Sequence, residues 1–488
     1  MLSVTGFGGV DEIGGNKFLI EDEKSRIFLD FGLSFKTSNK FLDEFLTPRK
    51  FNGLIDYQEL GLLPKIKGIY RTDYQKHTNP KDPVEELEFD ALFLTHAHAD
   101  HASYIHFLRK DLPFYGTKET FAILKSIEDC SNTTNTDLCT FTNSFEIGST
   151  KEGKPKRLDS RDPGILIPRP LNEINPNKKT LIGDFEIEPV LVNHSLLGAC
   201  AYLIRSPDAD IAFSGDIRLH GKSGFLTQNF AKKARNVKYL MIEGTRIDNQ
   251  NVKTELDVQN EISKIIRETS GLVVANWPSR DTDRLWSFFN AAIENDRILV
   301  ISSKQAYLLN QLAQSGADVP SIDNKNIRIF IQRRSWGLLG ISDQKDQILR
   351  DYSFVKWELG FLDHPNMVTF KDIQTDYSRY VFRADLFDMT DLIDIRPPQN
   401  SSYIRSMVEP FDDEMLVSEQ KLDNWLHHFK LKKFQTHCSG HAPSPDLIKI
   451  IEMIEPEFVI PIHTTNAQKF KELGFNCLFL SSGISKKI

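Results

Sequence analysis

The chain has 488 residues, of which 40% are hydrophobic and 26% are charged, and its formal net charge is −7. This length predicts more than one domain, the composition is that of an ordinary globular protein, and the sequence has no apolar run long enough to span a bilayer. The acidic balance excludes a protein that coats nucleic acid by bulk charge, although a local basic groove with two divalent metal ions would still hold a phosphodiester.

The first residues, Met1 to Gly6, lack the basic region and apolar core of a signal peptide. We therefore expect a cytoplasmic protein with no membrane partner. The five cysteines form no CxxC pair, which favours reduced structural thiols over a disulfide framework.

The amino-terminal segment alternates glycine pairs with short apolar runs. Residues 17–20 and 26–30 are predicted to be strands of a β-meander that opens a sheet. Asp30 ends the second run, and its position alone favours a turn cap over a partner for a metal ligand. Residues 33–81 show no regular pattern and are expected to form an insertion.

Four metal-capable side chains follow a short apolar run at residues 89–94, in the order HxHxDH. The run predicts a buried strand, and residues 102–108 predict the first turns of a helix. His96 and His98 are two residues apart and can grip one ion, while Asp100 and His101 can face a second ion. Imidazole and carboxylate are the ligands that zinc accepts in catalytic sites.

Three later strands each deliver a residue of the same type at their ends. Residues 185–192 lead to His194, residues 211–214 lead to Asp216, and residues 239–242 lead to Glu243. Because ligands collect at the carboxyl edge of a sheet in mixed α/β folds, this repetition favours one shared site. Between the motif and these strands we expect a strand at 113–117, a helix at 118–130 and a second, exposed insertion at about 131–180.

From residue 244 to residue 436 strands and helices alternate, which predicts a parallel α/β domain. Its expected strands and helices lie at 272–275, 282–294, 297–301, 305–313, 327–331 and 414–430. After this domain, His441 lies in a turn of small residues, and a helix at 444–454 and a strand at 458–462 lead to His463.

Together these motifs resemble a known family. HxHxDH, His194 and Asp216 resemble the metallo-β-lactamase fold, and the segments at Glu243, His441 and His463 resemble the three extra motifs of its β-CASP branch. That branch contains ribonuclease J, the cleavage and polyadenylation nucleases and the DNA cross-link repair nucleases. The resemblance implies an αββα sandwich, formed by residues 1–243 and 437–488, with an inserted α/β β-CASP domain at 244–436.

The resemblance also implies a metal-dependent hydrolase with two Zn²⁺ per chain. One ion would take His96, His98 and His194, the other would take Asp100, His101 and His463, and Asp216 would bridge them. His441 would be the general acid, held by Glu243, and Asp100 would serve catalysis as well as metal binding. Asp30 would orient metal ligands from behind.

The last motif bears on the substrate, because family members that act on RNA have histidine at the position of His463. We therefore expect RNA as the partner, allow for a homodimer, and hold Arg280, Arg284, Arg405 and Ser406 as weak candidates for phosphate contacts. The leading hypothesis is a ribonuclease of 5′–3′ exonuclease or endonuclease type. The alternatives are a DNA nuclease or broad phosphodiesterase, and a catalytically silent RNA-binding subunit.

Overall fold

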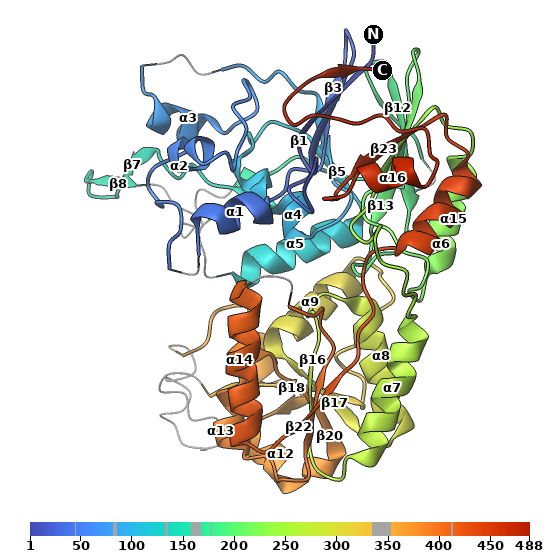
Figure 1. The fold of residues 1–488 in the computed structure, drawn as a ribbon. Helices are drawn as coiled ribbons and strands as arrows, with labels where there is room; N and C mark the ends of the chain where they lie inside the picture. The colour runs from blue at the N-terminus through green and yellow to red at the C-terminus, as the bar shows by residue number, and fades with distance from the viewer. Residues whose placement is uncertain are drawn as a thin grey trace. The chain divides into compact units, whose positions relative to one another are not determined.

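The computed structural model describes residues 1–43, 45–81, 85–131, 135–157, 167–176, 178–333, 353–410 and 413–488. The chain divides into two compact units (Figure 1). The first consists of Met1–Leu219, Ser223–Val252 and Gly440–Ile488, and the second of His220–Lys222 and Lys253–Ser439. The second unit is therefore an insertion in the first. Among the described helices, none combines the length and the apolar composition that crossing a membrane requires.

Two sheets form the centre of the first unit. The sheet of the amino-terminal half contains, in spatial order, β10 (Leu171–Glu173), β5 (Phe114–Gly116), β4 (Ala91–Phe93), β3 (Arg26–Leu29), β2 (Lys17–Glu21), β1 (Ser3–Gly8) and β24 (Lys486–Lys487). The other sheet contains β11 (Thr180–Ile182), β12 (Phe185–Leu191), β13 (Cys200–Arg205), β14 (Asp210–Phe213), β15 (Tyr239–Glu243) and β23 (Phe458–Ile462).

The two sheets pack face to face through alternating apolar side chains. The ring of Phe18 lies 5.6 Å from that of Phe213, and the ring of Phe93 lies 5.3 Å from that of Tyr202. All four residues belong to one buried cluster that both sheets share. Burial of this apolar area is the main driving force for joining the sheets.

Helices and connecting segments cover the outer faces of the sandwich. Helices α6 (Gly224–Lys233) and α15 (Ser444–Ile454) pack on the second sheet through Phe230 and Leu447 (Figure 1). This layering confirms the predicted αββα sandwich. The other helices of this unit are α1 (Phe35–Phe41), α2 (Ile55–Glu59), α3 (Thr72–Thr78), α4 (Ala99–Ala102), α5 (Lys118–Cys130) and α16 (Gln468–Glu472).

The second unit is built on a parallel sheet, as the alternating pattern predicted. Its strands in spatial order are β19 (Met367–Val368), β18 (Ile327–Phe330), β17 (Ile298–Ser302), β20 (Tyr380–Arg383), β16 (Val273–Asn276), β21 (Ser402–Arg405) and β22 (Lys432–Gln435). One face packs on α7 (Glu255–Glu268), α8 (Thr282–Glu294), α9 (Ser303–Gln314) and α11 (Leu359–Leu362). The other packs on α12 (Phe370–Thr375), α13 (Asp391–Ile395) and α14 (Asp413–His428).

The helix expected at residues 102–108 is wrong in type. The chain forms the short helix α4 and then a 3₁₀ turn at Ser103–Phe107. The carbonyl oxygen of His101 accepts a hydrogen bond from the backbone N–H of Phe31 at 2.7 Å. An α-helix would need that oxygen for residue 105, so the contact with Phe31 ends the helix.

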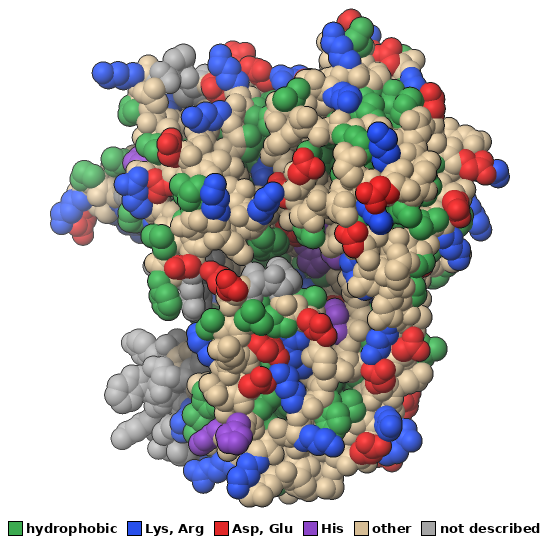
Figure 2. Space-filling model, in the orientation of Figure 1, with side chains coloured by type: hydrophobic (Ala, Val, Ile, Leu, Met, Phe, Trp, Pro, Cys, Tyr) green, Lys and Arg blue, Asp and Glu red, His purple; other side chains and the backbone are tan. Residues whose placement is uncertain are grey.

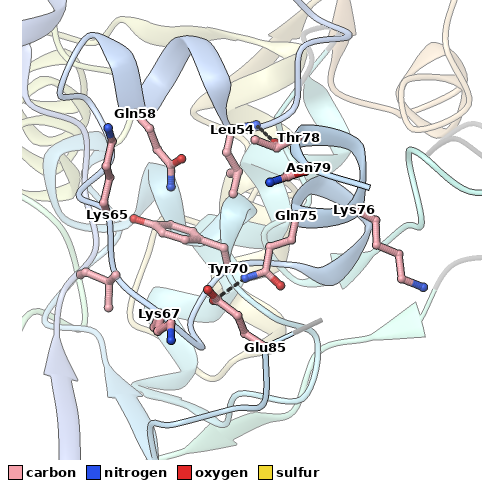
Figure 3. A pocket seen from close by; sticks show the side chains of 11 residues that line it. Leu54, Gln58, Lys65, Lys67, Tyr70, Gln75, Lys76, Thr78, Asn79 and Glu85 are labelled. Carbon is pink, nitrogen blue, oxygen red and sulfur yellow. Dashed lines mark hydrogen bonds between the residues drawn. The ribbon is translucent and has the colours of Figure 1, made fainter. Parts of the chain in front are cut away.

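The insertion at 33–81 is more regular than predicted, because it contains α1, α2 and α3. It also holds a pocket of about 260 Å³, in which the Gln75 amide donates to Glu85 at 2.6 Å beside the ring of Tyr70 (Figure 3). Among its described lining residues, none was a predicted site residue.

The second insertion, at 131–180, lies partly outside the described residues. Its described part contains the short pairs β6 (Thr140–Phe141) with β9 (Ile167–Pro168) and β7 (Ile147–Ser149) with β8 (Pro155–Arg157). Strand β13 and helices α6 and α7 were not predicted. On the face drawn in Figure 2, basic and acidic side chains are interspersed, in keeping with the modest net charge.

Candidate metal centre

Strand direction brings the polar strand ends of the first unit to one edge. Strands β14, β15 and β23 are mutually parallel, and their ends lead to Asp216, Glu243 and His463. Strand β12 runs the same way, because it is antiparallel to β13, which is antiparallel to β14. It leads to His194. In the facing sheet, β4 leads to the HxHxDH segment, whose side chains meet the other four residues at the same edge.

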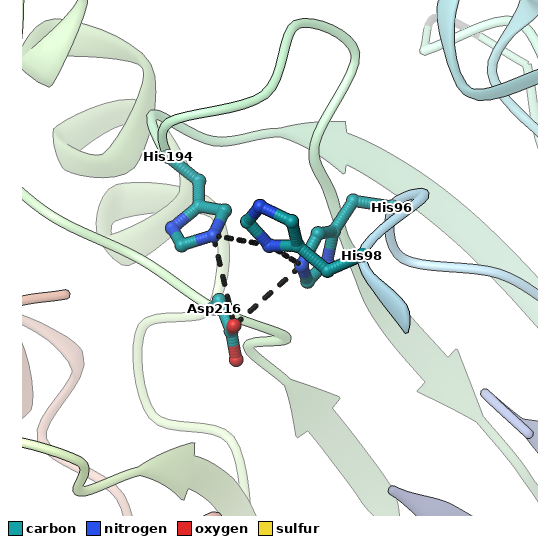
Figure 4. A group of neighbouring side chains, drawn as sticks. All are labelled: His96, His98, His194 and Asp216. Carbon is teal, nitrogen blue, oxygen red and sulfur yellow. Dashed lines mark hydrogen bonds and ion pairs between the residues drawn. The ribbon is translucent and has the colours of Figure 1, made fainter. Parts of the chain in front are cut away.

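The first group of ligand-type residues consists of His96, His98, His194 and Asp216 (Figure 4). Nδ1 of His98 lies 2.9 Å from Nε2 of His96 and 3.1 Å from Nε2 of His194. Oδ2 of Asp216 lies 3.5 Å from Nε2 of His96 and 3.7 Å from Nε2 of His194. The nitrogen atoms of three rings and one carboxylate oxygen thus converge on a single point.

The second group consists of Asp100, His101 and His463. Nε2 of His463 lies 3.1 Å from Oδ2 of Asp100, and Nε2 of His101 lies 3.2 Å from Oδ2 of Asp216. Oδ1 of Asp216 lies 3.8 Å from Nε2 of His463. Asp216 therefore faces both groups, with one carboxylate for two clusters.

Each of three imidazoles is fixed by a hydrogen bond on the side facing away from its group. Nδ1 of His194 donates to the carbonyl of Gly440 at 2.7 Å, and Nδ1 of His463 pairs with the Thr245 hydroxyl at 2.8 Å. Nδ1 of His101 contacts the carboxylate of Asp30 at 2.7 Å. Such outer hydrogen bonds select the tautomer whose other nitrogen is free to bind a metal.

Asp30 does not act as a turn cap, which its sequence position had favoured. Besides contacting His101, its carboxylate accepts from the backbone N–H of Thr95 at 2.7 Å and from the Thr95 hydroxyl at 2.8 Å. The side chain is fully buried, and burial raises its pKa. Asp30 thus links β3 to the start of the HxHxDH segment.

His441 stands beside the two groups and is partly open, with 21% of its side chain exposed. Its Nδ1 lies 2.9 Å from Oε2 of Glu243 and 3.8 Å from Oδ2 of Asp216. Burial lowers the pKa of this imidazole, but the Glu243 and Asp216 carboxylates outweigh that effect and raise the pKa to about 9. With this pKa, the imidazole of His441 carries a proton at neutral pH in the metal-free chain.

The electrostatics of the first group fit a metal cation. Burial lowers the pKa of His98 to about 4 and those of His96 and His194 well below the ordinary value, so all three rings are neutral with a free lone pair. Among the described residues, Oδ1 of Asp216 has no hydrogen-bond partner although it is buried. Neutral imidazoles and an unpaired carboxylate oxygen are the donor set that zinc takes.

The four weak candidates for phosphate contacts lie in the second unit. Arg284 is fully buried, and its guanidinium binds Glu255 at 2.7 Å and the Ser406 hydroxyl. Ser406 is itself buried, and Arg405 is 5% exposed and paired with Glu419 at 2.8 Å. These three side chains are buried and engaged in internal hydrogen bonds or ion pairs, which contradicts a phosphate contact in this conformation. Arg280 is exposed, and its phosphate contact stays a prediction.

One buried residue of the centre had no prediction. Asn16 is 1% exposed, and its Nδ2 lies 3.0 Å from Nε2 of His101. It follows the second of the two glycine pairs that stood out in the sequence, which was the only local signal for a constrained backbone at this point.

Comparisons with known proteins agree with this geometry. Residues 68–271 match the model of a beta-lactamase superfamily domain, and residues 427–477 match the model of a Zn-dependent metallo-hydrolase RNA specificity domain. A solved structure, titled as a protein of unknown function from Enterococcus faecalis V583, superposes with a TM-score of 0.73 at 23% identity and covers 100% of both chains. That likeness concerns the fold alone.

Curated relatives align over nearly the whole chain. Ribonuclease J of Helicobacter pylori is 22% identical across 98% of this chain, which spans 58% of the relative's length. Ribonuclease J of Mycoplasma genitalium is 24% identical across 94% of this chain and 67% of the relative. With the two family models, these alignments extend over both units. The chain therefore contains a beta-lactamase superfamily domain and a metallo-hydrolase RNA specificity domain, and along nearly its whole length it is similar to ribonuclease J.

Proposed function

We propose that this chain is a metal-dependent ribonuclease that hydrolyses RNA phosphodiester bonds with two zinc ions. The observation that carries the proposal is the Asp216 carboxylate, which lies between the two groups of ligand-type residues. Its Oδ2 is 3.5 Å from His96 in the first group and 3.2 Å from His101 in the second, and its Oδ1 is 3.8 Å from His463. A carboxylate with two such neighbours suits a pair of cations, since either cation alone would leave one group without its charge partner. His96, His98 and His194 would hold one ion, and Asp100, His101 and His463 the other.

Hydrolysis joins a water oxygen to phosphorus and breaks the bond from phosphorus to the 3′ oxygen. The water loses one proton and the 3′ oxygen gains one, which leaves a 5′-phosphate and a 3′-hydroxyl. Divalent zinc, when bound, lowers the pKa of water and neutralises charge on the phosphate. The remaining requirement is a proton for the leaving oxygen.

His441 is the proton donor in this proposal. Its Nδ1 is held by Glu243 at 2.9 Å, so Nε2 would be the nitrogen that donates a proton to the leaving 3′ oxygen. The Glu243 carboxylate is itself oriented, because Oε1 accepts from the backbone N–H of Ile217 at 2.8 Å. A bound cation would lower the pKa of His441 from about 9 toward neutrality, which is the useful range for a general acid.

RNA is the substrate that the family evidence favours. The match to an RNA specificity domain spans residues 427–477 and so includes both His441 and His463. The relatives that align along the chain carry the name ribonuclease J. A homodimeric assembly and a cytoplasmic location stay predictions.

The test is cleavage of RNA labelled at either end. The purified chain, loaded with zinc, is incubated with single-stranded RNA carrying a 5′-monophosphate or a 5′-triphosphate and with DNA of the same sequence. We expect metal-dependent cleavage of RNA, with mononucleotides if the enzyme works from an end and larger fragments if it cuts internally. Cleavage of DNA at an equal rate would replace the proposal by a broad phosphodiesterase, and no cleavage of either strand would overturn it.

A further inference from the structure

The loop between β1 and β2 is packed directly against the second group of ligand-type residues. The backbone N–H of Asn16 donates to the carbonyl of Asp100 at 2.9 Å, and the carbonyl of Gly9 accepts from the N–H of His463 at 2.7 Å. Gly14 has φ +82° and is so close to Asp100 that a Cβ atom there would lie 2.9 Å from the Asp100 side chain. The loop therefore has a fixed position relative to both residues.

Asn16 is the polar side chain that this loop places in the centre. It is 1% exposed, and its Nδ2 lies 3.0 Å from Nε2 of His101. Within the described part of the chain its Oδ1 has no hydrogen-bond partner, which is unusual for a buried amide oxygen. Neither the two groups of ligand-type residues nor the pair of His441 and Glu243 requires a carboxamide at this position.

The contact with His101 cannot persist in a metal-loaded centre. Nδ1 of His101 is engaged by Asp30 at 2.7 Å, so Nε2 is the nitrogen left to bind a cation. A cation on Nε2 would occupy the position next to this nitrogen at which Nδ2 of Asn16 lies in the metal-free chain, 3.0 Å away. The amide hydrogens of Asn16 then need another acceptor in the same space.

We propose that Asn16 contacts the substrate, with Nδ2 donating a hydrogen bond to a non-bridging oxygen of the phosphate being cleaved. The inference rests on the proposed function. A neutral donor suits this position, because the carboxyl groups of Asp30, Asp100 and Asp216 all lie within 3.9 Å of the His101 ring nitrogens and a further carboxylate would repel the phosphate. Attack on phosphorus increases charge on the non-bridging oxygens, so a fixed donor binds the transition state more tightly than the ground state.

Two variants separate this role from metal binding. Asn16→Ala removes the amide, and Asn16→Asp keeps its shape while exchanging the donor for an acceptor. Both are expected to lower kcat by roughly 10²–10³-fold, as loss of one such donor does elsewhere, and to retain the wild-type metal content measured by plasma mass spectrometry. The matched control is Asn366→Ala, whose amide donates to the carbonyls of Ile322 and Asn324 in the second unit. It should cleave at the wild-type rate.

Sulfur substitution gives a readout that a structural role would not change. RNA with a single phosphorothioate at the cleaved bond is prepared as separate Rp and Sp forms. In the wild type one form should be slowed by loss of the Asn16 contact, and in Asn16→Ala that slowing should shrink at least about tenfold, because the contact is already gone. Equal sulfur effects in both proteins would overturn the proposal, as would full activity of Asn16→Asp or loss of metal in proportion to activity.

A small diester distinguishes this failure from failure of the proposed function. Hydrolysis of bis(4-nitrophenyl) phosphate is measured alongside RNA for the wild type and both variants. Turnover of the diester without RNA cleavage would reject the ribonuclease while the variant comparison still decides the role of Asn16. Turnover of neither substrate by the metal-loaded wild type would reject both.

Discussion

Nδ1 of His441 lies 2.9 Å from Oε2 of Glu243, and the opposite oxygen of that carboxylate accepts from the backbone of Ile217. The glutamate is fully buried whereas the imidazole is 21% exposed. The buried partner thus holds one nitrogen of the ring, Nδ1, from the interior side. This arrangement fits the general acid role proposed for His441.

His441→Ala should lower the cleavage rate by roughly 10²–10⁴-fold without loss of bound metal, since general acid catalysis contributes that much. The rate is measured on end-labelled RNA, and metal content on the same sample. His428→Ala is the control, because His428 is exposed at the end of α14. Unchanged turnover in His441→Ala would remove the residue from the mechanism.

Asp216→Asn should reduce metal binding together with activity, because the Asp216 carboxylate faces both groups. An amide keeps the shape of the side chain but loses the negative charge that offsets two cations. Equilibrium dialysis with zinc measures the change as fewer ions per chain. The control is Asp210→Asn. Asp210 lies at the exposed start of β14, the strand that leads to Asp216, and this variant should leave metal content unaltered. Full occupancy with normal cleavage in Asp216→Asn would contradict the bridging role.

Arg284→Met should destabilise the second unit by about 3–5 kcal/mol, because it leaves the buried Glu255 carboxylate without the guanidinium that balances its charge. All five tryptophans lie between residues 253 and 439, so tryptophan fluorescence in urea reports on this unit. The control Arg333→Met breaks a surface ion pair with Asp394 in the same unit and should cost at most about 1 kcal/mol. An equally small change in Arg284→Met would show that Glu255 does not depend on the arginine.

His106→Asn should weaken the pH dependence of stability below about pH 6.5, the ordinary histidine pKa. Burial and the nearby Arg71 and Arg169 guanidinium groups hold the pKa of His106 well below that value, so the folded chain keeps it neutral. The unfolded chain binds a proton as the pH falls through about 6.5, and stability is lost below that point.

The measurement for His106 is urea unfolding of the metal-free protein, followed by far-ultraviolet circular dichroism, between about pH 5 and pH 8. The wild-type slope should exceed that of His106→Asn by up to about 1.4 kcal/mol per pH unit, the value for one proton. The same slope in both proteins would mean that His106 is protonated in the folded state or does not change its ionisation on unfolding.

The elements that the sequence predicted best are those with a strong local pattern. Helix α5 begins after Thr117, whose side chain caps the first turn, and it ends at Cys130 as its apolar spacing indicated. Strands β14, β15 and β23 are continuous apolar runs, and such runs are typical of strands buried on both faces. The ligand-type residues follow these strands directly, so the candidate site was readable from the chain.

The parts that were missed depend on contacts between distant segments. The carbonyl of His101 is taken by Phe31, which shortens a helix that local pattern favours. Arginine is a residue type that often binds phosphate, which made Arg284 a candidate. Its actual partner, Glu255, lies 29 positions away in a helix that was not predicted. Asn16 and His101 are 85 positions apart in the chain, and no periodic pattern in the sequence indicates that they are in contact. Tertiary packing decides these cases, and local propensity does not reveal it.

The most direct test of the central claim is a zinc titration of the metal-free chain, with bound ions and RNA cleavage measured in each sample. We expect no cleavage without metal, and activity that rises to its maximum as the second ion binds each chain. Full cleavage by protein kept free of metal with a chelator, or maximal activity at one ion per chain, would contradict a centre in which Asp216 serves two cations.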